Sequence, residues 1–425
     1  MRSGAFTAAR LIHRARQSSR WPVEKLRDHQ ERQLRALLSH AYQNVPLYRR
    51  LYQEAGFQPG DFRSLADVGR IPILRKTVLK AAGAEEVVAR GTNIRQCSVV
   101  CTSGSTGVPL KIYLGPFETQ WQRAVAWRIL FEHGFRWTDR TLEIRMTAGA
   151  AHGLQMLGIA RKDWLSILDS PQSWANCLAA GQHEIVVASA TTLGALAEAV
   201  EADGLSVKPP RIIVSDSETL PPRTRTLVRR VLGRDPVNVF GLVELSNFAW
   251  ECEQHNGFHI SADSHLVEVL ADAGEAGPLV VTDLGMRTMP MIRYETGDMA
   301  ELPRDDRPCP CGRTLPMLAR VQGRAVDSVL LGDGRRLFWP FFHEILGARD
   351  ELRQWRVTQT SPGSVQLQLC LDRADRPRGE QIAADVRARL PGELELIVEN
   401  VDCFPDVPNQ KTRQVISLLG KTPSC

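Results

Sequence analysis

The hydrophobic positions near the start of the chain follow a helical period. Apolar side chains recur there at steps of three and four residues, namely Leu34, Leu37, Leu38, Ala41 and Val45. This spacing is typical of an amphipathic helix, which we expect between Trp21 and Val45. Pro46 ends it, because proline cannot donate the backbone hydrogen bond that a continuing helix needs.

A different pattern follows in the middle of the chain, where short apolar runs alternate with helical stretches. The runs span Glu184–Ala188, Arg211–Val214 and Val237–Phe240, and a helical pattern precedes them at Phe117–Gly134. Strands separated by helices are typical of a parallel sheet with crossover connections. We therefore predict a large α/β domain.

The pattern changes again after Arg324. A strand, a Gly-Asp-Gly turn, a second strand and a short helix come first, followed by the order strand, strand, helix, strand. This order predicts a small α+β unit whose helices cover one face of a sheet. We expect two domains, residues 1–324 and 325–425.

Composition limits the classes of protein to which the chain can belong. Its 425 residues are 43% hydrophobic, enough for a large core in more than one domain. The 53 basic and 48 acidic residues give a mixed net charge of +5, which argues against a nucleic-acid partner. No stretch is long enough to span a bilayer. The nine cysteines are an odd number spread along the chain, which favours reduced thiols over a disulfide framework.

The first twenty residues carry several arginines and lack the continuous apolar core of a signal peptide. We therefore predict a cytoplasmic protein. The segment is also amphipathic, so a helix that targets an organelle or lies on a membrane surface is the alternative to a solvated first helix.

A loop rich in hydroxyl groups and glycine lies between two apolar runs, within Cys101–Leu114. Glycines let successive backbone N–H groups face an anion, and hydroxyls add further donors, so the loop is a candidate phosphate cradle. Val108 stands where a Walker loop would need lysine. An ordinary Ser/Gly hairpin turn is the alternative. The candidate phosphate-binding residues are Thr102, Ser103, Gly104, Ser105, Thr106 and Gly107.

Three later segments follow this loop in a fixed order. They are VFGLVE (Val239–Glu244), RYETGD (Arg293–Asp298) and GRAVDSVLLGDG from residue 323 to 334. With TSGSTGVPLK, these segments resemble the motifs of the adenylate-forming enzymes, and among them the phenylacetate-CoA ligase and coenzyme F390 synthetase-like branch. The resemblance covers nearly the whole chain. It implies a large N-terminal domain that binds ATP and an acid, and a small C-terminal lid.

The resemblance also assigns roles to residues at matching positions. It implies that Asp298 accepts hydrogen bonds from the ribose hydroxyls and that Arg324 approaches the same sugar. Phe240 stands where many relatives have tyrosine. SDSETL (Ser215–Leu220) resembles the family's turn beside the adenine, and it could equally be a helix cap, or both at once. A tight turn is the alternative for Thr296–Asp298. The expected ATP contacts beyond the loop are Asp216, Ser217, Glu218, Phe240, Gly241, Asp298 and Arg324.

Two residues are the expected catalytic groups. The resemblance implies that Glu244 holds Mg²⁺ against the phosphates, a role that suits a hard oxygen ligand. A surface glutamate at a helix start is the alternative. In NQKTRQVI, Lys411 matches the lysine that offsets negative charge during adenylation, and an exposed lysine in a basic tail is the alternative. Val326 at the hinge and Gln410 depart from the residues usual in the family.

Two distant pairs of residues could form a metal site. Cys309 and Cys311 lie in CPCGR, and Cys252 and His259 lie in ECEQHNGFH. Three thiolates and an imidazole would complete a closed, tetrahedral, structural zinc site. His255 or water could replace His259, and buried free cysteines are the alternative. Similar cysteine pairs in the F390 synthetase-like branch support the zinc interpretation.

These features together predict an AMP-forming acid–thiol ligase. The resemblance implies that ATP and Mg²⁺ activate a carboxylic acid, aromatic or arylacetic, as acyl-AMP. Coenzyme A then takes the acyl group after the lid rotates. An amine or hydroxyl acceptor is one alternative, and a nucleotide-binding homologue without catalysis is another. A homodimer is a candidate assembly.

Overall fold

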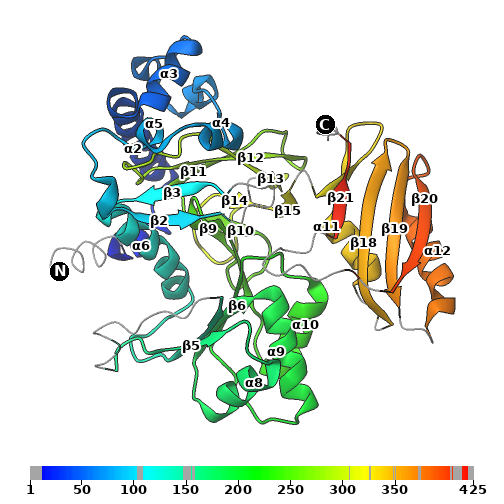
Figure 1. The fold of residues 1–425 in the computed structure, drawn as a ribbon. Helices are drawn as coiled ribbons and strands as arrows, with labels where there is room; N and C mark the ends of the chain where they lie inside the picture. The colour runs from blue at the N-terminus through cyan, green and yellow to red at the C-terminus, as the bar shows by residue number, and fades with distance from the viewer. Residues whose placement is uncertain are drawn as a thin grey trace. The chain divides into compact units, whose positions relative to one another are not determined.

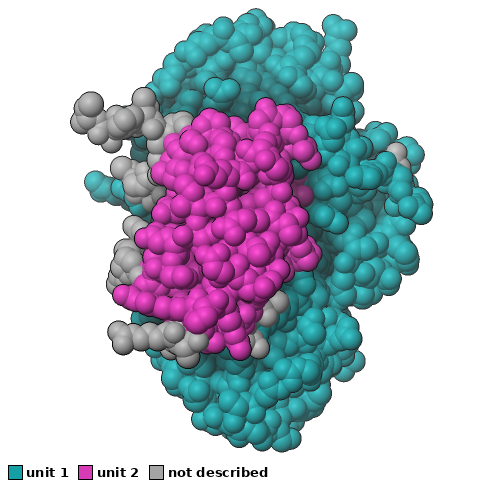
Figure 2. Space-filling model, turned by 90° about the vertical axis from the view of Figure 1, so that its right-hand side faces the viewer, with its two compact units in different colours: residues 1–296, 301–320 teal, residues 297–300, 321–425 magenta. Residues whose placement is uncertain are grey.

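The computed structural model describes most of the chain, in two compact units. The described residues are 12–102, 109–146, 155, 158–305, 307–324, 327–347, 349, 351–371, 375–402, 404 and 414–419. Unit 1 comprises residues 1–296 and 301–320, and unit 2 comprises residues 297–300 and 321–425 (Figure 2). The roles of the two domains, ATP binding and lid, stay predictions. Among helices in the described ranges, none has the length and apolarity needed to cross a membrane.

Unit 1 begins with helices formed by the predicted amphipathic segment and its neighbour. Pro46 ends the first helix and also opens the second, where its missing N–H costs nothing. The helices of this unit are α2 (Val23–Asn44), α3 (Pro46–Glu54), α4 (Lys76–Ala81), α5 (Ala84–Val87), α6 (Pro116–Glu132), α8 (Pro171–Ala180), α9 (Ala190–Ala202) and α10 (Pro222–Leu232).

An eight-stranded sheet forms the largest layer of unit 1 (Figure 1). Its order is β14-β10-β9-β8-β7-β6-β4-β5. The strands are β4 (Thr141–Arg145), β5 (Lys162–Ser166), β6 (Ile185–Ser189), β7 (Ile212–Asp216), β8 (Val237–Leu242), β9 (Ser246–Trp250), β10 (Phe258–Ile260) and β14 (Met317–Leu318).

The pairing of these strands confirms the predicted parallel arrangement of β6, β7 and β8. Strands β4 and β5, which the sequence pattern missed, extend the parallel part beyond β6. Helix α9 packs between α8 and α10 and against β6 and β7 (Figure 1). The core between these layers includes Leu142, Val186, Leu193, Leu196 and Ile213, all fully buried.

Two smaller sheets complete this part of the fold. One has the order β1-β13-β12-β11 and the other pairs β2 with β3. Their strands are β1 (Leu74–Arg75), β2 (Ser98–Cys101), β3 (Lys111–Leu114), β11 (His265–Val269), β12 (Ala276–Asp283) and β13 (Tyr294–Glu301), while β15 (Arg320–Arg324) follows β14 in the chain. Four residues of β13, Gly297–Ala300, are grouped with unit 2.

Unit 2 is the α+β unit that the sequence predicts. Its four-stranded sheet has the order β20-β19-β18-β21, and a hairpin pairs β16 with β17. Helices α11 and α12 share one hydrophobic core with the sheet. The pattern missed β21. The elements are β16 (Ser328–Leu330), β17 (Arg336–Phe338), α11 (Trp339–Leu346), β18 (Leu352–Ser361), β19 (Ser364–Leu371), α12 (Gly379–Arg389), β20 (Glu395–Val401) and β21 (Val415–Ser417).

Candidate active site and metal centre

The candidate phosphate loop connects the two strands of the β2–β3 hairpin. Thr102 closes its base, because its backbone N–H donates to Leu110 O at 3.0 Å and its Oγ1 accepts from Leu110 N at 3.1 Å. Residues Ser103–Gly107 lie outside the described residues. The structure therefore places Thr102, which is buried, at the entrance of the loop, and the cradle stays a prediction.

Glu244 is buried in the turn between β8 and β9, with 3% of its surface exposed. Its Oε1 accepts hydrogen bonds from Lys76 Nζ at 2.9 Å and from the Tyr294 hydroxyl at 3.0 Å. The alternative of a surface glutamate at a helix start is wrong, because the chain continues here into a strand.

Three segments far apart in the sequence meet at Glu244. Strand β1 pairs in parallel with β13, with Leu74 opposite Tyr294. Lys76 begins α4 directly after β1, so the same pairing that fixes Tyr294 also brings the ammonium group to the carboxylate. The sequence motifs did not indicate Lys76. A lysine at the start of a helix that follows a short strand is the only local signal.

The surroundings of Glu244 fit the hard-cation role that the sequence suggests. Both hydrogen bonds use Oε1. Among the described residues, Oε2 has no protein partner and is available to an oxygen-seeking ion such as Mg²⁺. Lys76 and Tyr294 hold the carboxylate in one orientation.

Phe240 and Gly241 lie near the end of β8, at an irregularity in its pairing with β9. A side chain at Gly241 would meet the backbone oxygen of Ser246 at 2.4 Å, so only glycine fits this close approach. The Phe240 ring packs edge-on against Phe248, with centroids 5.4 Å apart. The aromatic side chain is therefore fixed in orientation beside the glycine.

Asp216 is the last residue of β7 and forms a two-pronged ion pair. Its carboxylate oxygens each accept one hydrogen bond at 2.6 Å from Arg145, the last residue of β4. The sequence motifs predict Asp216 as an ATP contact but do not indicate Arg145. An arginine at the end of a strand that the pattern had missed carried no recognisable signal.

The turn after Asp216 is strained. Ser217 has a φ of 67°, in the left-handed region that residues other than glycine rarely adopt. Its hydroxyl donates to Asp216 Oδ1 at 3.0 Å, while Glu218 Oε2 accepts from the backbone and hydroxyl of Thr191. The alternative of a helix cap is wrong, because Pro221 occupies the N-cap of α10 without any side-chain hydrogen bond.

Asp298 lies inside strand β13, which rules out the alternative of a tight turn at Thr296–Asp298. The strand alternates, so Tyr294, Thr296 and Asp298 are all buried on one side of it. Arg324 is the half-buried last residue of β15. Lys411, the expected catalytic lysine, lies outside the described residues, as do Val326 and Gln410.

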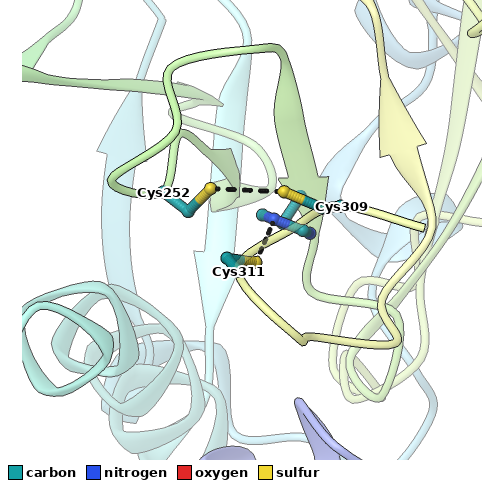
Figure 3. A group of neighbouring side chains, drawn as sticks. Cys252, Cys309 and Cys311 are labelled. Atoms are coloured by element: carbon teal, nitrogen blue, oxygen red, sulfur yellow. Dashed lines mark hydrogen bonds between the residues drawn. The ribbon is translucent and has the colours of Figure 1, made fainter. Parts of the chain in front are cut away.

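The four predicted metal ligands come together. Cys252, His259, Cys309 and Cys311 place one donor atom each within 4.8 Å of all the others. The sulfurs of Cys252 and Cys309 are 3.6 Å apart, and Cys311 Sγ is 3.3 Å from His259 Nε2 (Figure 3). A tetrahedral zinc site has sulfur–sulfur edges of about 3.8 Å and sulfur–nitrogen edges of about 3.6 Å, from its usual bond lengths.

The pairing of strands explains why these residues meet. Strand β10 lies between β9 and β14, with His259 opposite both Trp250 and Met317. Cys252 follows β9, and the other two cysteines precede β14. The sequence left open whether His255 is a ligand. It binds Arg225 and Glu251 instead, so His259 is the imidazole of the cluster.

Protonation of the cluster depends on burial and on one arginine. Burial raises the pKa of Cys252 to about 12 and also raises the pKa of Cys309. For Cys311, hydrogen bonds from Arg313 outweigh burial and lower the pKa. Burial lowers the pKa of His259 to about 4, so the imidazole is neutral. A metal bound here would displace the thiol protons.

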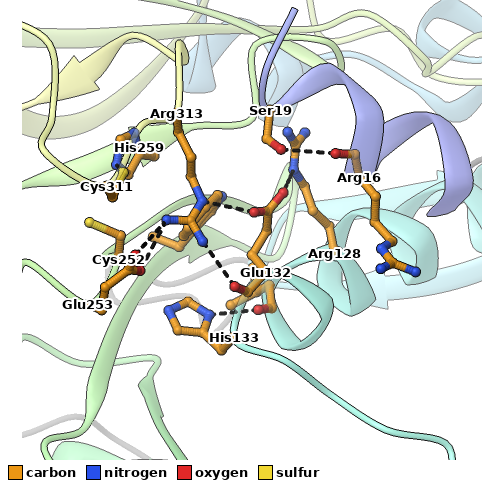
Figure 4. Close-up of polar contacts among 12 residues, drawn as sticks. Arg16, Ser19, Arg128, Glu132, His133, Cys252, Glu253, His259, Cys311 and Arg313 are labelled. Carbon is orange, nitrogen blue, oxygen red and sulfur yellow. Dashed lines mark hydrogen bonds and ion pairs between the residues drawn. The ribbon is translucent and has the colours of Figure 1, made fainter.

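A network of charged groups, all buried except Glu253, adjoins the cluster (Figure 4). Arg313 donates to Glu132 at 2.8 Å and to Glu253 at 3.0 Å. Glu132 also lies 3.8 Å from Arg128, which pairs with buried Asp263. This network joins the end of α6 to the loop that carries Cys309 and Cys311.

Known proteins resemble this chain in sequence and in fold. Phenylacetate-coenzyme A ligase of Thermus thermophilus is 30% identical over 334 residues, 73% of each chain. The enzyme of the same name from Pseudomonas putida is 27% identical over 73% of each chain. Among solved structures, 2-hydroxyisobutyryl-CoA ligase in its postadenylation state superposes with a TM-score of 0.75 at 20% identity, over 94% of this chain and 91% of that one.

No protein-family model matches the chain. The likeness to 2-hydroxyisobutyryl-CoA ligase shows that the chain has the adenylate-forming fold. Among proteins with this fold, the identity to the Thermus thermophilus ligase indicates the family, and the motif order agrees with it. The chain belongs to the phenylacetate-coenzyme A ligase family of adenylate-forming enzymes.

Proposed function

We propose that the protein activates a carboxylic acid with ATP to form acyl-AMP, and then transfers the acyl group to coenzyme A. The substrate is an aromatic or arylacetic acid. Membership of the phenylacetate-coenzyme A ligase family supports the reaction type. The single structural observation that carries the proposal is buried Glu244, which Lys76 and Tyr294 orient through Oε1 while Oε2 has no partner among the described residues.

Adenylation joins two anions, so positive charge has to be placed around the reacting phosphate. An oxygen of the acid attacks the α-phosphorus of ATP, and the bond from that phosphorus to pyrophosphate breaks. Mg²⁺, when bound, neutralises phosphate charge. Glu244 supplies the oxygen ligand for it, while Asp298 and Arg324 hold the ribose and Lys411 approaches the α-phosphate.

The second half of the reaction uses the small C-terminal unit. In the proposal, this unit rotates as a lid after adenylation and admits the thiol of coenzyme A to the acyl-AMP. The thiol sulfur then attacks the acyl carbon, AMP leaves, and the thiol loses its proton. An amine or hydroxyl acceptor would give an amide or ester by the same first step.

ATP–pyrophosphate exchange tests the first step directly. We would assay wild type and Lys411→Ala with aromatic, arylacetic and aliphatic acids, with Lys421→Ala as the control lysine nearby in the chain. Mass spectrometry of products with and without coenzyme A then identifies the acceptor. We expect exchange with at least one aromatic acid, a fall of about 100-fold or more in Lys411→Ala, and an acyl-CoA product.

Other outcomes contradict specific parts of the proposal. Exchange without a thioester would point to an amine or hydroxyl acceptor. If ATP binds but no acid supports exchange, the protein is a nucleotide-binding homologue without catalysis. If Lys411→Ala catalyses ATP–pyrophosphate exchange at the wild-type rate, Lys411 has no catalytic role.

The second part of the proposal concerns the metal centre. We propose that Cys252, His259, Cys309 and Cys311 hold a structural Zn²⁺. The two measured edges of the cluster lie within a few tenths of an ångström of a tetrahedral site. Four protein ligands leave no open position, and adenylation needs none. The positive charge of Arg313 offsets part of the negative charge that three thiolates bring.

A further inference from the structure

The parallel part of the large sheet has one point where the strand order reverses. Strand β4 pairs in parallel with β5 on one side and with β6 on the other. The chain runs outward from β4 to β5, returns to β6 and then continues to β7 and β8. In open parallel sheets, ligands bind beyond the carboxyl ends of the strands at such a reversal.

A charged pair spans this reversal. Arg145 is the last residue of β4 and Asp216 the last residue of β7, with β6 between them. Their side chains are 25% and 10% exposed. The guanidinium and carboxylate form two parallel hydrogen bonds of 2.6 Å, a geometry that fixes both groups.

A second pair supports the first. Glu143 lies two residues before Arg145 in β4, on the same side of the strand, and accepts from its Nε at 3.2 Å. Lys162 of β5 donates to the other oxygen of Glu143 at 2.8 Å. Two cations and two carboxylates thus form a polar cluster without net charge along β4, from Asp216 and Arg145 at the carboxyl end to Lys162 at the start of β5.

Arg145 has more N–H donors than its partners in the described residues accept. Burial alone would lower its pKa, but the hydrogen bonds and charge of Asp216, with Glu143, raise it, so the guanidinium stays charged. Of its five N–H groups, three donate to partners in the described part of the chain. An unsubstituted aryl or alkyl group placed here would leave the other two without an acceptor, which costs binding energy.

The adjoining turn is built to hold Asp216 in place. The strained Ser217 donates to its Oδ1 at 3.0 Å. Strained turns persist where surrounding contacts hold them, and they gather at ligand sites.

We propose that Arg145, held by Asp216, selects acids that carry a hydroxyl or carbonyl oxygen in addition to the reacting carboxylate. The inference rests on the proposed function and names the substrate class more narrowly, as oxygen-substituted aromatic or arylacetic acids. Arg145 is the donor to that oxygen, and Asp216 positions it.

Pairs of acids that differ by one oxygen test this proposal. ATP–pyrophosphate exchange would compare phenylacetic with 4-hydroxyphenylacetic and mandelic acids, and benzoic with the three hydroxybenzoic acids. In at least one pair, the wild-type kcat/KM should be higher for the oxygenated acid by roughly 10- to 100-fold. This ratio corresponds to the free energy of one hydrogen bond to a charged group. Arg145→Met should reduce that ratio to about 1.

The control lies at the opposite end of the same strand. Arg140 precedes β4 and pairs with Asp163 at 2.6 Å, so Arg140→Met removes a similar ion pair far from the carboxyl edge and should keep the wild-type ratio. Arg145→Lys retains the charge with fewer donors and should give an intermediate ratio, which covers the case in which Arg145→Met does not fold.

Three results would overturn the proposal. In the first, the wild-type kcat/KM for each unsubstituted acid equals that for its oxygenated partner. Arg145→Met could lower kcat/KM for both members of each pair equally, which would mean a role in folding or ATP binding. Exchange with no acid at all would instead overturn the proposed function on which the inference rests.

Discussion

Glu244 and Asp263 are both buried carboxylates, and their partners give them different roles. Within the described ranges, Glu244 is paired through one oxygen, with Lys76 and Tyr294. Asp263 lies within a buried network and pairs with Arg128, which is 1% exposed. A carboxylate with a free oxygen can still take a ligand, whereas one held inside a network stabilises the fold.

Replacing Glu244 tests its role as a metal ligand. Glu244→Gln keeps the size and one oxygen but removes the charge that attracts a cation. We expect the Mg²⁺ concentration that gives half-maximal ATP–pyrophosphate exchange to rise by about 10-fold or more. Glu295→Gln, an exposed carboxylate on strand β13, is the matched control. An unchanged Mg²⁺ dependence in Glu244→Gln would exclude the assigned role.

The Arg128–Asp263 pair should control acid stability. Burial would raise the pKa of Asp263, but the charge of Arg128 outweighs burial and lowers it. A carboxyl with a lowered folded-state pKa stabilises the protein above its unfolded pKa of about 3.9 and loses that contribution as the pH falls. Asp263→Asn should therefore cost about 3–5 kcal/mol at pH 7, and the difference from wild type should shrink below pH 4.

Urea unfolding followed from pH 7 to pH 3 measures this effect. Asp305→Asn, which removes an exposed carboxylate paired only with Arg307, should leave the pH profile unchanged. A constant difference between wild type and Asp263→Asn at every pH would show that the loss comes from packing and not from the ionised pair.

Strands β10 and β14, at one edge of the large sheet, are short, with three and two residues. Few backbone hydrogen bonds hold such strands together. The metal ligands lie in β10 and in the loops beside β9 and β14, so a bound ion would link all three. This explains why a closed metal site would be placed here and not in the longer strands.

The metal content of purified protein tests this explanation. We expect one zinc per chain by elemental analysis, and a strong chelator should lower the melting temperature by about 5 °C or more. Cys309→Ser should lose the metal, while His259→Cys, which supplies a fourth thiolate, should keep it. Cys177→Ser in α8 removes a cysteine outside the cluster and serves as control. Wild type without stoichiometric metal after growth with zinc would contradict the assignment.

The division into two compact units matters for the order of the two half-reactions. Asp298 and Arg324, both assigned to the ribose, are grouped with the smaller unit, and Glu244 belongs to the larger one. In the proposed reaction, the smaller unit rotates between the two half-reactions. Val326 is the position at which the family resemblance expects a charged hinge residue, and it lies outside the described residues.

Restricting the backbone at position 326 should affect the second half-reaction more than the first. Proline fixes φ near −65°, so Val326→Pro limits the change of backbone angles that a rotating lid requires. We expect ATP–pyrophosphate exchange to stay within about 3-fold of wild type and acyl-CoA formation to fall by about 10-fold or more. Val326→Ala is the control and should retain both. Equal loss of both activities would argue against lid rotation.

The sequence by itself predicted the features that depend on neighbouring residues. Helical and strand periods gave α2, α6, the parallel order of β6 to β8 and most of the C-terminal α+β unit, because side-chain spacing records which face is buried. The motif order gave the family. The spacing of cysteines and histidine gave the ligand set of the metal site, although it left His255 and His259 as alternatives.

Only the tertiary structure decided which distant residues meet. The pairing of β1 with β13 brought Lys76 to Glu244, and the order of strands β4, β6 and β7 brought Arg145 to Asp216. No local pattern encodes these contacts, because they arise from strands joined across more than seventy residues. A charged residue at the end of a strand has the same sequence signature whether it faces solvent or a partner, and only the sheet determines which.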